Sequence, residues 1–154
     1  MPEYTYEMDY LCTYSATLAP PEVIGPVAEG IRINFYVTGG EANGPKLRGK
    51  LRPVGGDWLT LRRDGIAVLD VRATFETAEG ALIYVIYNGI GDLGPDGYEN
   101  FLAGKMPERV HLRTAPRMWS VHPDYLWVNR VQCVGVGAVT FAASAVSYDL
   151  YALR

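Results

Sequence analysis

Cysteine and histidine are scarce in this sequence of 154 residues. The only cysteines, Cys12 and Cys133, lie far apart and outside any CxxC or Cys/His motif, so we expect two buried free thiols. His111 and His122 are the only histidines, which leaves little material for a transition-metal site. We therefore expect no bound metal and no other cofactor.

Long apolar runs and excess positive charge are also missing. The longest uncharged stretch, residues 131–148, is interrupted by glycine and polar residues, whereas a membrane-spanning helix needs about 20 mostly apolar residues. The first ten residues carry acidic but no basic side chains, the reverse of a signal peptide. A formal net charge of −3 gives no positive field to attract phosphate backbones. These features predict a cytoplasmic protein that binds neither membranes nor nucleic acids.

The composition that remains is typical of one folded domain spanning residues 1–154. Hydrophobic residues make up 49% of the chain and charged residues 20%, and the 12% of aromatic residues argue against disorder. The 17 glycines and 10 prolines favour many turns over long helices.

Apolar residues recur mostly with period two, in short runs separated by turn residues, which indicates β-strands. Gly39-Gly40 and Gly55-Gly56-Asp57 are expected to be turns, and one short helix is expected between residues 91 and 104. The predicted strands are 6–18, 31–38, 46–53, 58–62, 66–77, 81–87, 109–114, 126–135 and 140–153. We expect an all-β fold, a single antiparallel β-barrel of about nine or ten strands with a central cavity, because closure removes exposed strand edges. A β-sandwich is the alternative.

Asp57 is the first candidate for chemistry. It follows two glycines and precedes Trp58, so that a carboxylate would lie beside an aromatic wall. Partial desolvation would raise the pKa of Asp57 and make it a plausible general base or acid. The alternative is that Asp57 only accepts hydrogen bonds from turn amides.

The predicted strands also carry polar side chains whose direction the sequence leaves open. Asp70 and Arg72 alternate with apolar residues, and they face either solvent or a barrel cavity. Tyr84 lies on a strand that is apolar on both faces at its centre. It either donates a hydrogen bond into the cavity or is a core tyrosine with its hydroxyl at the rim.

Residues 113–129 combine guanidinium, aromatic and amide groups. Arg113, Trp127 and Asn129 could together orient a carbonyl or an enolate, since arginine offers a fixed fork of donors, or they could belong to an ordinary polar loop. Trp58 and Tyr36 are further candidate substrate contacts. No dinucleotide-binding glycine motif, phosphate-binding loop or nucleophile elbow is present.

Several short motifs occur in an order that resembles a known family, the domain of unknown function 3237, also called uncharacterised protein family 0311. The resemblance covers nearly the whole chain. The motifs are Gly44-Pro45-Lys46-Leu47-Arg48-Gly49, Gly55-Gly56-Asp57-Trp58, Arg63-Asp64-Gly65, Asp70-Val71-Arg72, Gly80-Ala81-Leu82-Ile83-Tyr84, Leu112-Arg113-Thr114-Ala115-Pro116-Arg117 and Tyr125-Leu126-Trp127-Val128-Asn129-Arg130.

The resemblance implies a β-barrel with a central cavity, broadly similar to allene-oxide-cyclase and lipocalin-like barrels. It implies that residues 91–108 are variable and form a lid that influences substrate choice. This chain departs from the family pattern at Leu112, where an aromatic residue is usual, and near Met118, where a phenylalanine is usual. The resemblance marks these polar and aromatic positions: Asp57, Asp70, Tyr84, Arg113, Trp127 and Asn129.

Three functions remain open at this stage. The first is a cofactor-independent isomerase, cyclase or lyase that transfers protons on a small hydrophobic cyclic or aromatic metabolite. Asp57 would be the base, Tyr84 and Arg113 the donors, and Asp70 either the partner of Arg72 or a second acid. The second function is a non-catalytic, lipocalin-like carrier of a lipophilic molecule. The third is an interaction module whose two-sided apolar strands form a homodimer or higher oligomer.

Overall fold

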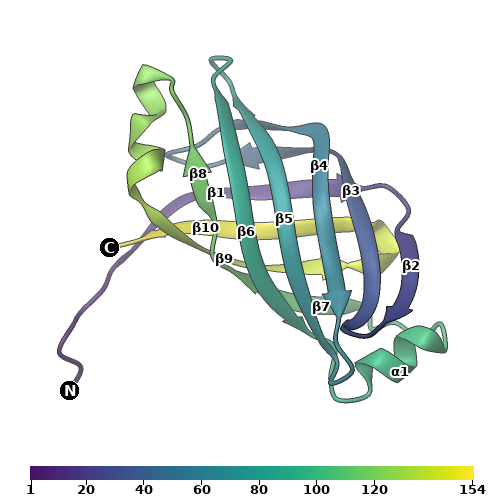
Figure 1. The fold of residues 1–154 in the computed structure, drawn as a ribbon. Coiled ribbons are helices and arrows are strands. Elements are labelled where there is room, and N and C mark those ends of the chain that lie inside the picture. The colour runs from purple at the N-terminus through teal and green to yellow at the C-terminus, as the bar shows by residue number, and fades with distance from the viewer.

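Ten antiparallel strands make up most of the chain in a computed structural model that describes residues 1–154 (Figure 1). Three short helices interrupt them: α1 (Gly97–Leu102) and the 3-10 helices η1 (Pro123–Arg130) and η2 (Phe141–Ala143). No helix is long and apolar enough to cross a membrane. The strands are β1 (Met8–Leu18), β2 (Glu22–Val27), β3 (Gly30–Asn43), β4 (Gly49–Leu61), β5 (Ile66–Thr77), β6 (Leu82–Asp92), β7 (Arg109–Thr114), β8 (Arg117–Trp119), β9 (Gln132–Thr140) and β10 (Ala145–Leu153).

Eight of the strands close into a barrel. Around the ring the order is β1-β10-β9-β7-β6-β5-β4-β3, and β3 pairs with β1 to complete the circle. The other two strands lie outside this ring, β2 beside β3 and β8 beside β6. The predicted single antiparallel barrel is confirmed, with ten strands in all, of which eight form the ring. The sandwich alternative is excluded because the ring of strands is closed.

Side-chain alternation decides which residues face the interior. On β5 the apolar set with odd numbers, from Ala67 to Phe75, is buried. The polar set, including Asp70 and Arg72, points outward and is about half exposed. On β6 both faces are apolar, as predicted, and the outward residues Leu82 and Ile90 stay more than half exposed. The predicted homo-oligomer stays a prediction.

Both paired glycines that we expected in turns lie within strands. β3 runs through Gly39-Gly40 and β4 runs through Gly55-Gly56, and at each place the pairing register shifts, which is a β-bulge. Gly55 has φ +87°, a left-handed conformation that favours glycine. The expectation of a turn at Asp57 was therefore wrong, because the glycines bend one long strand instead of ending it.

Other boundaries also differ from the sequence prediction. Residues 126–130 belong to η1 rather than to a strand, because Pro123 starts a helical turn. The Asp124 N–H at the start of this turn donates a hydrogen bond to His122 Nδ1 at 3.2 Å. β2 was missed. The one short helix expected between residues 91 and 104 is confirmed as α1. Cys12 and Cys133 are buried and unpaired, as expected.

The barrel interior is filled unevenly. One cluster of buried residues, which includes Phe75, Ile83 and Val128, lies toward η1, and a second, which includes Ile31, Tyr98 and Tyr148, lies toward α1. Figure 1 shows these two helices at opposite ends of the barrel. An eight-stranded barrel has room for core side chains or for one small ligand. Here core side chains fill both ends of the interior, and a cavity remains between them.

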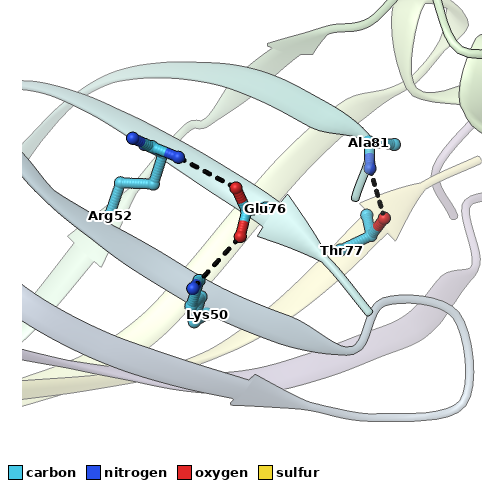
Figure 2. A network of polar contacts seen from close by, with 5 residues as sticks. All are labelled: Lys50, Arg52, Glu76, Thr77 and Ala81. Atoms are coloured by element: carbon cyan, nitrogen blue, oxygen red, sulfur yellow. Dashed lines mark hydrogen bonds and ion pairs between the residues drawn. The ribbon is translucent and has the colours of Figure 1, made fainter. Parts of the chain in front are cut away.

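The β5–β6 turn is held by a buried hydroxyl next to a surface ion network (Figure 2). Outside the barrel, Glu76 pairs with Lys50 at 3.2 Å and with Arg52 at 2.9 Å. Thr77, only 3% exposed, accepts the Ala81 N–H at 3.0 Å. The exposed ion pairs contribute little to stability because water screens them, whereas the buried hydroxyl satisfies an amide that water cannot reach.

Thr77→Val is therefore expected to lower the free energy of unfolding by about 1–2 kcal/mol, because it leaves the buried Ala81 amide without that acceptor. Thr74→Val on the same strand is the matched control, since the Thr74 hydroxyl makes no hydrogen bond, and it should change stability by less than about 0.5 kcal/mol. Urea unfolding of both variants measures the difference. Equal losses in the two would show that the Thr77 hydroxyl has no special role.

Candidate functional site

A cavity of about 110 Å³ lies within the barrel, and 26 of its 29 lining residues are hydrophobic. No lysine, arginine or histidine lines it. The groups able to exchange hydrogen bonds with a ligand are few and come from β1, β4, β6 and β10: Cys12, Tyr14, Asp57, Tyr87 and Tyr148. A mostly apolar cavity with a few convergent polar groups is the usual form of a small-molecule site.

Asp57 reaches the cavity because of its place in the strand register. It lies opposite Phe35 on β3 and opposite Val71 on β5, and Val71 in turn lies opposite Tyr87 on β6. Residues opposite each other in adjacent antiparallel strands point to the same face. These four residues therefore form one inward-facing row across β3, β4, β5 and β6. The bulge at Gly55 lies directly before Asp57 and sets its direction.

The Asp57 carboxyl is the only carboxyl group in the cavity. Burial, as the main cause, raises its pKa to about 7, and the negative charge of Asp70 adds to the rise. The Asp70 backbone N–H donates to Asp57 Oδ1 at 2.9 Å, and this bond and Arg32 act in the opposite direction. Oδ2 makes no hydrogen bond within the chain. Near neutral pH, Asp57 is thus divided between its acid and base forms.

Three tyrosines stand together in the same cavity. The rings of Tyr14 and Tyr148 stack at 5.2 Å between centroids, and Tyr87 meets Tyr148 edge-on at 5.8 Å. Burial raises the pKa of Tyr87 to about 12 and the pKa values of Tyr14 and Tyr148 well above their usual range. The charge of Asp57 adds to the rise for Tyr87 and Tyr148, which places both phenols near that carboxyl. At neutral pH all three remain protonated and able to donate.

Glycines on β9 make room for the tyrosine group. Gly137 lies opposite Tyr148 on β10, and a Cβ built on Gly137 would lie 2.6 Å from Tyr148 Cδ1 and against the Ser147 backbone. No real side chain fits there without moving the strand. The absence of a side chain at Gly137 therefore leaves room for the Tyr148 ring.

The hydroxyl of Tyr14 is buried and makes no well-aligned hydrogen bond, although Tyr87 lies close to it. An unpaired buried hydroxyl lowers stability, so Tyr14→Phe is expected to raise the free energy of unfolding by up to about 1 kcal/mol. Tyr125→Phe is the comparison, because the Tyr125 hydroxyl donates to Glu79 at 2.6 Å, and this variant should lower stability. Thermal unfolding of both variants measures the signs. A loss in Tyr14→Phe as large as in Tyr125→Phe would show that the Tyr14 hydroxyl is already satisfied.

The sequence profile of a family described as "Protein of unknown function (DUF3237)" matches residues 6–153. The chain therefore belongs to the DUF3237 family. A relative from Rhodopseudomonas palustris (strain TIE-1), named a UPF0311 protein, is 30% identical over 150 residues and covers 96% of both chains. The resemblance proposed from the motifs is confirmed.

Solved structures with this DUF3237 fold include a β-barrel like protein from Acinetobacter baumannii. It is 28% identical, with a TM-score of 0.85 over 99% of both chains. A structure described as an enzyme from Penicillium herquei is 17% identical, with a TM-score of 0.71 over 100% of this chain and 98% of that one. The second likeness shows that a catalytic protein shares the fold.

The two donors expected from the sequence, Tyr84 and Arg113, do not lie in the cavity. Tyr84 is 45% exposed on the outer face of β6, where its ring packs against Trp119. Arg113 is exposed on β7 and donates to the Leu112 carbonyl at 2.9 Å. The expectation that they face the cavity was wrong for the same reason in both cases. Side chains alternate along a strand, and the residues next to Tyr84 and Arg113 in the sequence are the ones that face the interior.

The expected substrate contacts also lie outside the cavity. Asp70 and Arg72 form an ion pair of 2.9 Å on the outer face of β5. Tyr36 donates to Glu22 at 3.0 Å, and its ring meets Trp58 edge-on at 6.3 Å, again on the outer face.

The last two candidates have structural surroundings. Trp127 packs against the core cluster near η1. The Asn129 side-chain amide donates to the Ser120 carbonyl at 2.7 Å and accepts from the Ser120 N–H at 3.1 Å. Of all the candidates named from the sequence, Asp57 alone lines the cavity.

Tyr14, Tyr87 and Tyr148 were missed, although the sequence held one clear signal for Tyr87. Tyr87 shares its strand face with Ile83, while Tyr84 shares the other face with Leu82 and Asn88, so the more apolar face contains Tyr87. No group of three or more histidine, cysteine, aspartate or glutamate side chains could hold a metal ion.

Proposed function

We propose that this protein is a cofactor-independent enzyme that transfers protons on a small hydrophobic cyclic or aromatic molecule bound in the barrel. The reaction is an isomerisation, a cyclisation or an elimination. One observation carries the proposal: a single carboxyl, Asp57, lies in an otherwise apolar cavity with its pKa raised to about 7. A catalytic acid or base works best when its pKa lies near the pH at which it operates.

The tyrosines supply the second part of this chemistry. Asp57 takes a proton from a C–H or O–H group of the substrate, and the negative charge moves to a substrate oxygen. A phenol O–H, from Tyr87 or Tyr148, donates to that oxygen. These two phenols suit this role because both lie near Asp57, and the buried Tyr14 hydroxyl lies against Tyr87. Donors held in place within an apolar site stabilise a developing oxyanion more than water does.

The proton cycle needs no other reactant. Asp57 returns the proton to a different atom of the substrate, which gives an isomer or a cyclised product, or passes it to a leaving group, which gives an elimination. Electrons are redistributed within the substrate, and no oxidant or reductant is consumed. The carboxyl ends each turnover in the ionisation state in which it began.

The test is a screen of neutral aromatic and terpenoid carbonyl compounds against the wild type and Asp57→Asn. Thermal shift identifies binders, since a ligand that binds only the folded state stabilises it by mass action. Chromatography and mass spectrometry then show whether each binder is altered. A compound that stabilises both proteins and is converted only by the wild type supports the enzyme. Compounds bound by both and returned unchanged would instead support the lipocalin-like carrier.

A further inference from the structure

A second cavity of about 230 Å³ lies at the α1 end of the barrel. Its walls come from β3, β4 and β5, from Phe101 of α1, from Met106 and from Phe141 of η2. Seven of its fourteen lining residues also line the first cavity, among them Phe35, Leu59 and Leu93. The two spaces thus share walls and adjoin within one barrel. We call the first the Asp57 chamber and the second the α1 chamber.

The two chambers differ in chemistry. The Asp57 chamber holds the carboxyl and the phenols, whereas Ser144 is the only residue with a polar side chain in the α1 chamber. Neither chamber contains a lysine, arginine or histidine. Arg32 influences Asp57 only from the outside, where its guanidinium donates to Thr60 at 2.7 Å. A buried anionic group would find no positive partner and would face Asp57, which is costly.

α1 is anchored through Tyr98, and Phe101 and Met106 form part of the wall of the α1 chamber. Tyr98 is buried, and Arg63 holds it by a hydrogen bond of 3.2 Å and by packing of the guanidinium 5.2 Å from the ring centroid. Met106 remains 37% exposed. The wall of the α1 chamber is therefore made of large apolar side chains on an anchored segment, and their size limits what fits.

We propose that the two chambers form one site for a two-part ligand that carries no negative charge. An acidic head, such as a phenol or an enol, lies at Asp57, and an apolar tail extends into the α1 chamber, with its length limited by Phe101 and Met106. The proposal rests on the proposed function for the position of the head. It adds the class of the ligand and the residues that select it.

The experiment is calorimetric titration of a series of 4-alkylphenols, from methyl to heptyl, into the wild type and Asp57→Asn at pH 8. Each methylene buried should increase affinity about 4-fold until the α1 chamber is full, after which the gain stops. Phe101→Ala should move this limit to longer chains, and Met106→Ala is a second variant with the same expectation. The control is Leu102→Ala, because Leu102 is on the same helix, is 51% exposed and lines neither chamber. It should leave the series unchanged.

Matched 4-alkylbenzoates test the exclusion of negative charge, because neither chamber offers a positive side chain to a carboxylate. The benzoates should bind at least 10-fold more weakly than the phenols. Affinity that is independent of chain length, tighter binding of the benzoates, or an equal shift in Leu102→Ala would overturn the proposal. The titration measures binding separately from catalysis. Chain-length dependence with no turnover of any screened compound would contradict the proposed enzymatic function and support the two-chamber ligand site. Turnover without chain-length dependence would support the enzymatic function and contradict the two-chamber site.

Discussion

Asp57→Asn is expected to make the protein more stable at pH 8, with an effect of roughly 4 kcal/mol relative to pH 4. In the unfolded chain the Asp57 carboxyl has its usual pKa of 3.8, and in the folded chain the pKa is about 7. Between these values the folded state binds more protons than the unfolded state. The contribution of Asp57 to stability therefore falls as pH rises from about 4 to about 7, and asparagine removes this fall.

Urea unfolding of the two proteins across this pH range measures the difference. Carboxyls with lowered pKa values, such as Glu22 and Glu76, change stability in the opposite direction, but they do so equally in both proteins and cancel. Glu29→Gln controls for the loss of an exposed carboxylate that does not act on Asp57, and the variation of its stability with pH should match that of the wild type. A difference between wild type and Asp57→Asn that does not vary with pH would contradict burial of this carboxyl.

The same substitution is expected to lower kcat on a converted substrate by about 10²–10⁴-fold, the usual contribution of a general base. Binding should change little, because an amide keeps the shape of the carboxyl. With Asp57 as the base, kcat/KM of the wild type should rise with pH and level off above about pH 7. The remaining activity of Asp57→Asn should lack this inflection.

Steady-state kinetics from pH 5 to pH 9 provides both readouts. Tyr84→Phe is the matched control, because Tyr84 lies on the outer face of the barrel and should leave kcat and its pH dependence unchanged. A wild-type profile without the inflection, or turnover by Asp57→Asn within a few-fold of wild type, would remove Asp57 from the reaction.

The fold could be read from the sequence because its cause is local. Apolar and more polar residues alternate from Ala67 to Phe75, and in the structure the apolar ones face the barrel interior and the others face outward. The bulges could not be read in the same way. A pair of glycines such as Gly55-Gly56 suits a turn as well as a kink, and only the pairing of β4 with both neighbours decides between them.

The candidate site was only partly predictable, because direction into the cavity depends on register. Asp57 was found from its local sequence, beside glycines and an aromatic residue. Tyr84 was chosen over Tyr87, although a shift of one position reverses the face that a side chain occupies. Tyr14 and Tyr148 line the same cavity as Asp57, but they come from β1 and β10, which are far from β4 in the chain, and no local pattern reveals this arrangement.

The central claim is that a carboxyl in the barrel titrates near neutral pH, and carboxyl ¹³C NMR tests it most directly. The spectra of the wild type and Asp57→Asn, recorded from pH 3 to pH 9, assign the Asp57 signal by its absence in the variant. We predict a midpoint near pH 7 for that signal. A midpoint below about pH 5, as for an ordinary exposed carboxyl, would contradict the account.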